Sequence, residues 1–359
     1  MRLSFMGSLS LVAISLAVSL TFHDADASTR IFWNSNDEEV MLSARNMDLD
    51  EGDQPTIYAV PAGKSKTGGI NDNPATWTSK YGSVVITLKG YANVCDEGIN
   101  TQGLAFHYLY LKGSEYETRD SRPGVDGGIY GQYLLDNAAN VTEALTLMSQ
   151  TQLVPGWIGT FYPCHLALEN AAGDSAVVEF VGGQMKVYHD PDKPAYILTN
   201  EPPLDQQRAN LTLYKGFGGD LPWPGDVDSK SRFVRASAFL KTLNIDPYWF
   251  ICPDRISRLF SAIRAEATPF GAIMFKDDGS EVYAWPTLWT SLFDLTNKAI
   301  YFTHSIARNN FWIDMGKLKL SPGAPVLYLK ADRTDLFGDV SKLLRPPAQP
   351  ALLLLLLSN

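Results

Sequence analysis

A serine stands directly after a cleavage signal near the start of the chain. Residues 1–27 contain Arg2, then an apolar run from Leu9 to Phe22, and end in Ala25-Asp26-Ala27, a small-x-small pattern typical of signal peptides. Cleavage there makes Ser28 the first residue of the mature chain. Its hydroxyl can attack an acyl carbon while its own α-amino group, of intrinsic pKa about 7.7–8.0, takes the proton. We therefore predict Ser28 as a candidate N-terminal nucleophile.

The leader also bears on where the protein acts. Its apolar run is shorter than the roughly 20 residues that cross a bilayer, so we predict cleavage and no stable membrane anchor. The mature chain is expected to be exported, to the periplasm or the medium. Near the other end, Leu352–Leu357 is an isolated leucine run, and we expect residues 341–359 to form a disordered tail.

The composition narrows the classes of partner and cofactor. The chain has 359 residues, 45% of them hydrophobic, and a formal charge of −9. An acidic balance argues against binding nucleic acid, because contact with phosphates needs a basic surface. The 3 cysteines are an odd number at wide spacing and indicate no disulfide framework. No histidine left after cleavage has a metal-ligand spacing, so we predict no metal and no other cofactor.

Several short motifs follow Ser28 in a fixed order. They are Ser28-Thr29-Arg30-Ile31-Phe32, Ala44-Arg45-Asn46-Met47-Asp48, Trp77-Thr78-Ser79-Lys80-Tyr81-Gly82-Ser83, Asp96-Glu97-Gly98-Ile99-Asn100, Leu198-Thr199-Asn200-Glu201-Pro202 and Ser231-Arg232-Phe233-Val234-Arg235. Their order and spacing resemble the choloylglycine hydrolase family of N-terminal nucleophile hydrolases, specifically its penicillin V acylase branch, over nearly the whole mature chain. The resemblance implies a hydrolase of linear non-peptide amides. Penicillin V, acyl homoserine lactones and conjugated bile acids are the candidate small-molecule substrates.

The resemblance also implies a role for each matched residue. Asp48 would orient the α-amino group of Ser28, and Arg45 would lie beside the nucleophile. Asn200 would donate its side-chain N–H to the oxyanion, where such donors act most strongly, and Arg232 would complete the site. Asp48, Arg45 and Asn200 also have ordinary structural alternatives, respectively a loop acid, an ion-pair partner and a turn asparagine. Arg235, one helical turn after Arg232, is expected to be a structural partner.

Further expectations concern the acyl pocket and the assembly. Tyr110 falls where relatives carry a residue that borders the acyl pocket and lends a backbone N–H to the oxyanion, although a strand tyrosine is also an ordinary core residue. Leu49 follows Asp48 where related acylases have tryptophan, which predicts a different pocket wall. The family often assembles as tetramers, so a homotetramer is a candidate assembly.

The nucleophile itself departs from the family, whose members begin with cysteine. A thiol of pKa about 8.5 can be driven to thiolate by a neighbouring cation, whereas a serine hydroxyl cannot. With Ser28 the α-amine must act as a true general base. Two alternatives follow: an active serine amidohydrolase, or a weakened or inactive acyl-ligand-binding protein on the same scaffold.

The elements that must position these residues are mainly strands. Alternating or β-branched runs predict strands at Ile31–Trp33, Glu39–Ala44, Ser83–Leu88, Gly103–Leu111, Cys164–Leu168, Ser175–Val181, Tyr196–Thr199, Glu281–Trp285 and Ala299–His304. Helical periodicity predicts helices at Ile129–Ala138, Val141–Gln150, Arg232–Thr242 and Asp254–Glu266, the second capped by Asn140. Between Tyr162 and Thr199, turn signals predict an antiparallel meander.

Strands in consecutive runs with helices grouped between them indicate an α+β fold with antiparallel sheets. The resemblance implies a four-layer αββα N-terminal nucleophile hydrolase sandwich. We expect it to occupy residues 28–340, between the signal peptide of residues 1–27 and the tail of residues 341–359.

Overall fold

The computed structural model describes residues 28–347, apart from 35–39, 50–51, 89–93, 157–162, 244, 246–247, 249 and 276–277. The predicted signal peptide and the six-leucine run lie outside the described residues. Within the described part, no helix is both long enough and apolar enough to cross a bilayer.

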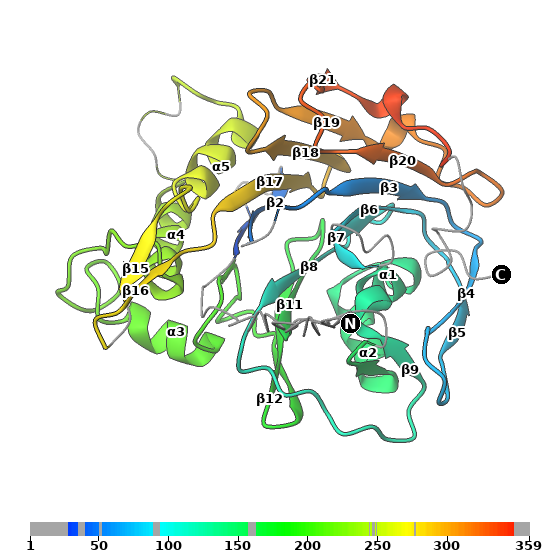
Figure 1. The fold of residues 1–359 in the computed structure, drawn as a ribbon, viewed down its shortest axis with the longest axis horizontal. Helices are drawn as coiled ribbons and strands as arrows, with labels where there is room; N and C mark the ends of the chain where they lie inside the picture. Colours follow the sequence, from blue (N-terminus) through cyan, green and yellow to red (C-terminus); the bar gives the residue numbers. More distant parts are fainter. Residues whose placement is uncertain are drawn as a thin grey trace, which may run out of the picture.

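Two large sheets form the centre of the molecule (Figure 1). Among the described residues the first has seven strands, in the order β14 (Ile197–Leu198), β1 (Thr29–Asn34), β2 (Met41–Asp48), β17 (Thr287–Asp294), β18 (Ala299–His304), β19 (Phe311–Asp314) and β21 (Gly338–Asp339). All neighbours in it are antiparallel except β19 and β21.

The second sheet is antiparallel across its eight described strands. Their order is β13 (Gln184–Tyr188), β12 (Ser175–Val181), β11 (Cys164–Glu169), β8 (Ala105–Tyr110), β7 (Cys95–Asn100), β6 (Ser83–Thr87), β3 (Thr56–Val60) and β20 (Leu327–Lys330). Short two-stranded pairs are added by β4 (Ser65–Thr67) with β5 (Thr76–Thr78), β9 (Gly124–Asp126) with β10 (Gln152–Val154), and β15 (Ile273–Phe275) with β16 (Glu281–Tyr283).

Helices cover the outer face of each sheet. On the second sheet lie α1 (Gly127–Asn137) and α2 (Val141–Gln150), while α3 (Leu204–Leu211), α4 (Ser229–Leu243) and α5 (Arg255–Arg264) lie on the side of the first. Short 3₁₀ helices occur at η1 (Met315–Lys317) and η2 (Ser341–Leu343). The predicted α+β, four-layer αββα sandwich is confirmed.

An apolar cluster lies between each pair of neighbouring layers. Alternation along β1 shows how the sequence achieves this: Ile31 and Trp33 pack toward the helices, and Phe32 packs toward the second sheet. On β17 all eight residues are buried, because both faces of this central strand are covered. Such a strand has no solvent-exposed face, and on β17 polar and apolar residues occur on both faces, so it lacks the alternating pattern by which the sequence analysis predicted strands.

The predicted helices are all present, with ends shifted by one to three residues in three of them. The predicted cap of α2 is confirmed, since Asn140 accepts a hydrogen bond from the backbone N–H of Glu143 at 2.9 Å. Helix α3 was not predicted; it is short and mostly polar, with only Leu204 and Gln207 buried.

The predicted meander is confirmed for β11, β12 and β13, but its last strand is not part of it. Strand β14 pairs instead with β1 of the first sheet, through Arg30 opposite Leu198. The chain therefore changes sheets just before Asn200, and this crossing carries Asn200 toward the start of β1.

The predicted tail boundary at residue 341 is wrong for residues 341–347. Helix η2 forms there, Leu344 is buried, and the backbones of Arg345 and Tyr328 exchange hydrogen bonds at 2.8 and 3.1 Å. The ordered domain extends at least to residue 347 because this segment covers the edge of the second sheet.

Candidate active site

Ser28 lies at the start of β1, where β2 brings Asp48 alongside it. Strands β1 and β2 pair with Thr29 opposite Asn46, so the end of β2 reaches the residue before Thr29. The backbone nitrogen of Ser28 donates to Asp48 Oδ2 at 3.1 Å. Thr287 of β17 donates to the other oxygen, Oδ1, at 2.5 Å. Asp48 is thereby held between two neighbouring strands and aimed at the nitrogen of Ser28.

The Asp48 carboxyl is buried and contacts Ser28, Thr287 and Arg232. Burial raises its pKa above the ordinary value, and the charge of Arg232, the Thr287 hydroxyl and the Ser28 N–H offset only part of that effect. The Asp48 carboxyl is fully buried, and Arg232 Nη1 lies 3.9 Å from its Oδ2. The buried Asp48 carboxyl is therefore placed to accept a hydrogen bond from the Ser28 nitrogen.

Arg232, on α4, ties three segments of the site together. Its guanidinium donates to the backbone oxygen of Ser28, to Thr29 Oγ1 and, at 2.9 Å, to Asn200 Oδ1. The side chain is completely buried. Its planar fork of donors lets one residue fix the backbone of Ser28 and the amide of Asn200 at once.

Asn200 follows β14 and faces the site with its side chain. Its backbone N–H donates to Ser229 Oγ at 2.8 Å, and its Nδ2 donates to the backbone oxygen of Tyr110 at 2.8 Å. Tyr110 thus enters the site through its carbonyl group, and its ring lies 5.7 Å from the ring of Trp285. The predicted contribution of the Tyr110 N–H has no counterpart among the contacts just described.

Arg45 reaches Ser28 from the middle of β2. Its Nη2 donates to Ser28 Oγ at 3.3 Å, and its Nη1 pairs with Asp96 and, at 3.3 Å, with Glu97. Burial alone lowers the pKa of Arg45, but the two carboxylates outweigh burial and raise it. Burial also raises the pKa of Asp96 to about 6, although Arg45 acts against that rise. A fixed cation therefore lies against the candidate nucleophilic oxygen.

The structure brings together Ser28, Arg45, Asp48, Asn200 and Arg232, with the backbone of Tyr110 beside them. Thr287 belongs to the same site, but the sequence analysis missed it. It lies on the strand that was not predicted, and a threonine gives no signal by type. Arg235, one turn after Arg232, pairs outside the site with Glu266 at 2.9 Å.

A buried ion network continues from Arg45 across the gap between the sheets. Glu97 contacts His107 Nδ1 at 2.8 Å, and Glu169 contacts His107 Nε2 at 2.8 Å and Arg30 at 3.0 Å. All these side chains are buried. The carboxylates raise the pKa of His107 against the opposing effect of burial. Arg45 is thus one end of a chain of alternating charges.

The sequence analysis examined His107 only for metal spacing and assigned no role to Glu97 or Glu169. A usable signal was present for His107, which stands between Phe106 and Tyr108 in a predicted strand, where burial without a partner is costly. Glu97 lies between Asp96 and Gly98 and gave no such signal. Within the described part of the chain, no group of three or more His, Cys, Asp or Glu side chains is placed to hold a metal ion.

Known proteins resemble this chain over most of its length. The family described as linear amide C–N hydrolases, choloylglycine hydrolase family, matches residues 28–337. A penicillin V acylase of Pectobacterium atrosepticum is 30% identical over 369 aligned positions, covering 96% of this chain and 95% of that protein. A bile salt hydrolase/transferase of Lactiplantibacillus plantarum is 38% identical over 90 positions, which cover 19% of this chain and 26% of that protein.

Two solved structures share the fold of this chain. Penicillin V acylase from Agrobacterium tumefaciens has a TM-score of 0.75 and 30% identity, covering 89% of this chain and 97% of its own. A variant of the conjugated bile acid hydrolase from Clostridium perfringens has a TM-score of 0.71 at 20% identity, over 86% of this chain and 98% of its own, and shows the fold alone. By sequence and by fold, this chain belongs to the choloylglycine hydrolase family of linear amide C–N hydrolases.

Proposed function

We propose that the mature protein begins at Ser28 and hydrolyses linear non-peptide amides through an acyl-enzyme on the Ser28 hydroxyl. The observation that carries the proposal is the pair of contacts made by one residue, its nitrogen with Asp48 and its Oγ with Arg45. Removal of residues 1–27 turns that nitrogen from an amide, whose lone pair is delocalised, into a basic amine. Nucleophile and base then belong to the same residue.

The proposed reaction has two halves. Ser28 Oγ attacks the carbonyl carbon, its proton passes to the α-amine, and negative charge moves to the carbonyl oxygen beside the Asn200 side-chain N–H. When the C–N bond breaks, the α-ammonium gives its proton to the leaving amine, and the acyl group stays on Oγ as an ester. Water, deprotonated by the same amine, then hydrolyses the ester and releases the acid.

The anchoring contacts support this role for the amine. Asp48 accepts from the Ser28 nitrogen, and Arg232 holds the Ser28 carbonyl oxygen, so both ends of the residue are fixed. Fixing a reacting pair in one geometry supplies a large part of catalysis, since displacement by about 1 Å can cost roughly 100-fold in rate.

An aromatic wall beside Asn200 supports substrates with an aryl or medium-length acyl group. The Tyr110 ring lies 5.7 Å from Trp285, and Trp285 belongs to a small apolar cluster against which Leu49 and Val227 pack. An aryloxyacetyl group, as in penicillin V, matches such a wall, and so does the acyl chain of an acyl homoserine lactone. The similarity to penicillin V acylases along nearly the whole chain supports the first.

Turnover by three versions of the mature protein tests the proposal. Native protein, Ser28→Cys and Ser28→Ala are each incubated with penicillin V and with a long-chain acyl homoserine lactone, and the released amine is measured. The proposal expects turnover by the native protein and none by Ser28→Ala. Activity only in Ser28→Cys would overturn it in favour of an acyl-ligand-binding protein on an intact scaffold. Inactivity of all three would refute the assigned pocket or the assigned first residue.

We also propose that the chain is exported and cut after Ala27. The family match begins at residue 28, directly after the small-x-small pattern, which supports a mature start at Ser28. Expression of the whole chain in a Gram-negative host, followed by fractionation and N-terminal mass spectrometry, should recover periplasmic protein that starts Ser28-Thr29-Arg30. A cytoplasmic protein that retains its leader would contradict this.

A further inference from the structure

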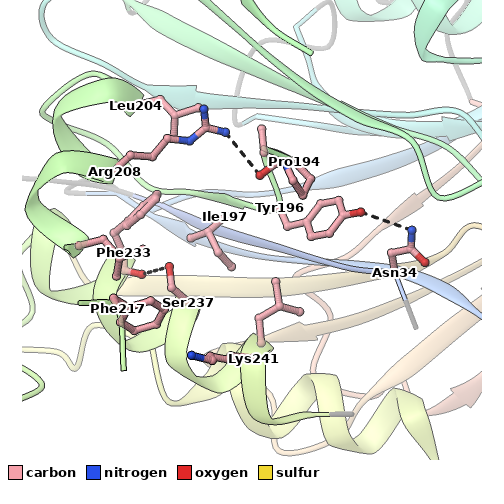
Figure 2. Close-up of a pocket in the computed structure, with 13 residues that line it drawn as sticks. Asn34, Pro194, Tyr196, Ile197, Leu204, Arg208, Phe217, Phe233, Ser237 and Lys241 are labelled. Atoms are coloured by element: carbon pink, nitrogen blue, oxygen red, sulfur yellow. Dashed lines mark hydrogen bonds between the residues drawn. The ribbon is translucent and has the colours of Figure 1, made fainter. Parts of the chain in front are cut away.

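A cavity of about 560 Å³ lies on the helical side of the first sheet, away from the catalytic residues (Figure 2). It is bordered by residues before and in β14 and by α3 and α4. Its lining includes Ile197, Leu204, Arg208, Phe233, Ser237 and Lys241. Ser28, Asn200 and Arg232 do not line it. The volume is in the range of small-molecule sites, about 300–1,000 Å³.

The centre of this cavity is apolar. Leu204 and Phe233 come from the buried core between the helices and the first sheet, as does Ile197 of β14. The Ser237 hydroxyl is turned to the backbone oxygen of Phe233 at 2.7 Å, and the Tyr196 hydroxyl accepts from Asn34 at 3.4 Å. The polar groups of the wall are thus engaged with one another, and the space favours a hydrocarbon chain.

Two cations border this apolar centre, and no carboxylate of the described residues pairs with either of them. Arg208 Nη2 donates to the backbone oxygens of Lys193, at 2.9 Å, and Pro194. Lys241 Nζ donates to the backbone oxygen of Gly216 at 2.7 Å. Their other contacts are to the aromatic rings of Tyr188 and Phe217. Carbonyl groups and rings do not cancel a charge, so this edge stays positive on a protein of formal charge −9.

We propose that the cavity is a second ligand site, separate from Ser28, for a small carboxylate with an apolar chain, such as a free medium-chain fatty acid. The chain would lie against Leu211, Phe217 and Leu240, the partly exposed apolar residues of the lining. The carboxylate would pair with Arg208, whose guanidinium offers further N–H groups in the planar fork that matches a carboxylate. Lys241 would add to the positive field at the rim. The proposal does not depend on the proposed hydrolysis, because no residue of the cavity takes part in it.

Binding of decanoate to the purified protein tests the charge requirement. Calorimetry would compare native protein, Arg208→Gln/Lys241→Gln, and Lys319→Gln/Lys330→Gln, which removes the same charge at exposed positions far along the chain. The cavity variant should bind decanoate about tenfold more weakly or worse, and the control should match native. Equal affinity in the cavity variant would overturn the proposal. Decyltrimethylammonium should not bind the cavity, since its head group repels both cations.

The position of the ligand must be measured as well, because an acyl-amide hydrolase can also hold an acid at Ser28. Crystals soaked with 10-bromodecanoate should show an anomalous bromine peak between β14, α3 and α4, in native protein and in Ser28→Ala alike. A peak only beside Ser28 and Trp285 would refute the second site. Ser237→Leu, which narrows the cavity from α4, should abolish the peak between the helices while the amide-hydrolysis assay stays unchanged. Failure of hydrolysis in the native protein would leave this result unaffected.

Discussion

Asn200 shows how a single side chain can be given one orientation. Its Oδ1 accepts from Arg232 at 2.9 Å, and a guanidinium can only donate, so the amide cannot be reversed. Its Nδ2 must then face the opposite way, where it meets the Tyr110 carbonyl at 2.8 Å. Arg232 therefore holds the Asn200 amide in one orientation, and the proposed oxyanion role requires a donor that is fixed before the substrate binds.

Asn200→Ala should therefore reduce kcat far more than it changes KM. Loss of one oxyanion donor costs about 10²–10³ in kcat. The measurement is steady-state hydrolysis of penicillin V by Asn200→Ala, in the Ser28 or Ser28→Cys protein, whichever is active, with a thermal melt to show that the variant is folded. A kcat within twofold of the parent would show that the oxyanion is held elsewhere.

At the scale of the elements, charged side chains from several strands form a buried ion network between the two sheets. Arg30 and Arg45 of β1 and β2 face Glu97, His107 and Glu169 of the second sheet, and all are buried. Alternation along each strand puts these charges on the inner face. Burial alone raises the pKa of Glu169, but Arg30 and His107 outweigh it and hold the value at about 2. The network keeps both glutamates ionised and gives Arg45 a fixed place.

His107→Gln should destabilise the protein in a pH-dependent way. The folded-state pKa of His107 is raised, so its contribution is complete below the unfolded pKa of about 6.5 and is lost as pH rises through the folded value. Removing one partner of a buried ion pair costs about 3–5 kcal/mol. Urea unfolding should show this loss at pH 5.5 and a smaller loss at pH 9.5.

A matched control for this prediction is His189→Gln, which removes a partly exposed histidine paired with Asp174 at 2.8 Å. Exposed pairs contribute about 0–1 kcal/mol, so this variant should unfold nearly like native protein. A pH-independent loss in His107→Gln would contradict the assigned protonation of His107.

The contact between α4 and the end of α5 gives a second pH-dependent element. Burial raises the pKa of Glu266 to about 7, and the charges of Arg235 and Arg232 offset only part of the rise. The folded state therefore holds a proton on Glu266 that the unfolded chain releases near pH 4.5. The contribution of Glu266 to stability falls as pH rises from about 4.5 to about 7 and is constant above that.

Glu266→Gln should remove this slope. The ionisation cost is on the order of 3 kcal/mol between pH 4.5 and 7, since each pKa unit corresponds to about 1.4 kcal/mol. Urea unfolding of native and variant protein is measured at pH 5, 6, 7 and 8. The free energy of unfolding of the variant should increase relative to that of native protein as pH rises. A parallel pH dependence of the two would mean that Glu266 titrates normally.

At the scale of the whole molecule, the proposed cleavage before Ser28 would decide whether the proposed α-amine base exists. Ser28 has φ of 94°, a backbone conformation that residues other than glycine rarely adopt and that costs roughly 1–3 kcal/mol. This torsion is defined by the carbonyl carbon of the preceding residue, so cleavage abolishes the constraint. The proposed cleavage would also create an amine at the nitrogen that donates to Asp48 Oδ2 at 3.1 Å.

A chain that cannot expose Ser28 should fold but not react. We expect a version carrying a factor Xa site directly before Ser28 to have no amidase activity until it is cut, because an amide nitrogen cannot take the serine proton. Cutting should restore the activity of the mature protein with little change in the melting temperature. Activity before cutting, verified by intact mass, would contradict the role of the α-amine.

The sequence by itself determined the family motifs, the fold class and most of the candidate site. Strands β1 and β2 pair as neighbours in the chain, and this pairing places Arg45 and Asp48 beside Ser28. Alternating apolar residues set the register of the pair. Residue type limited the roles further, because only a few side chains can attack, donate or hold a charge.

Tertiary structure decided the rest, because contacts between distant segments leave no local pattern. Strand β17 is buried on both faces and lacks alternation, so neither it nor Thr287 was predicted. The crossing of β14 to the first sheet, which delivers Asn200, depends on pairing across 168 residues between Arg30 and Leu198. The partners of His107, and the cavity between α3 and α4, exist only where separate layers meet.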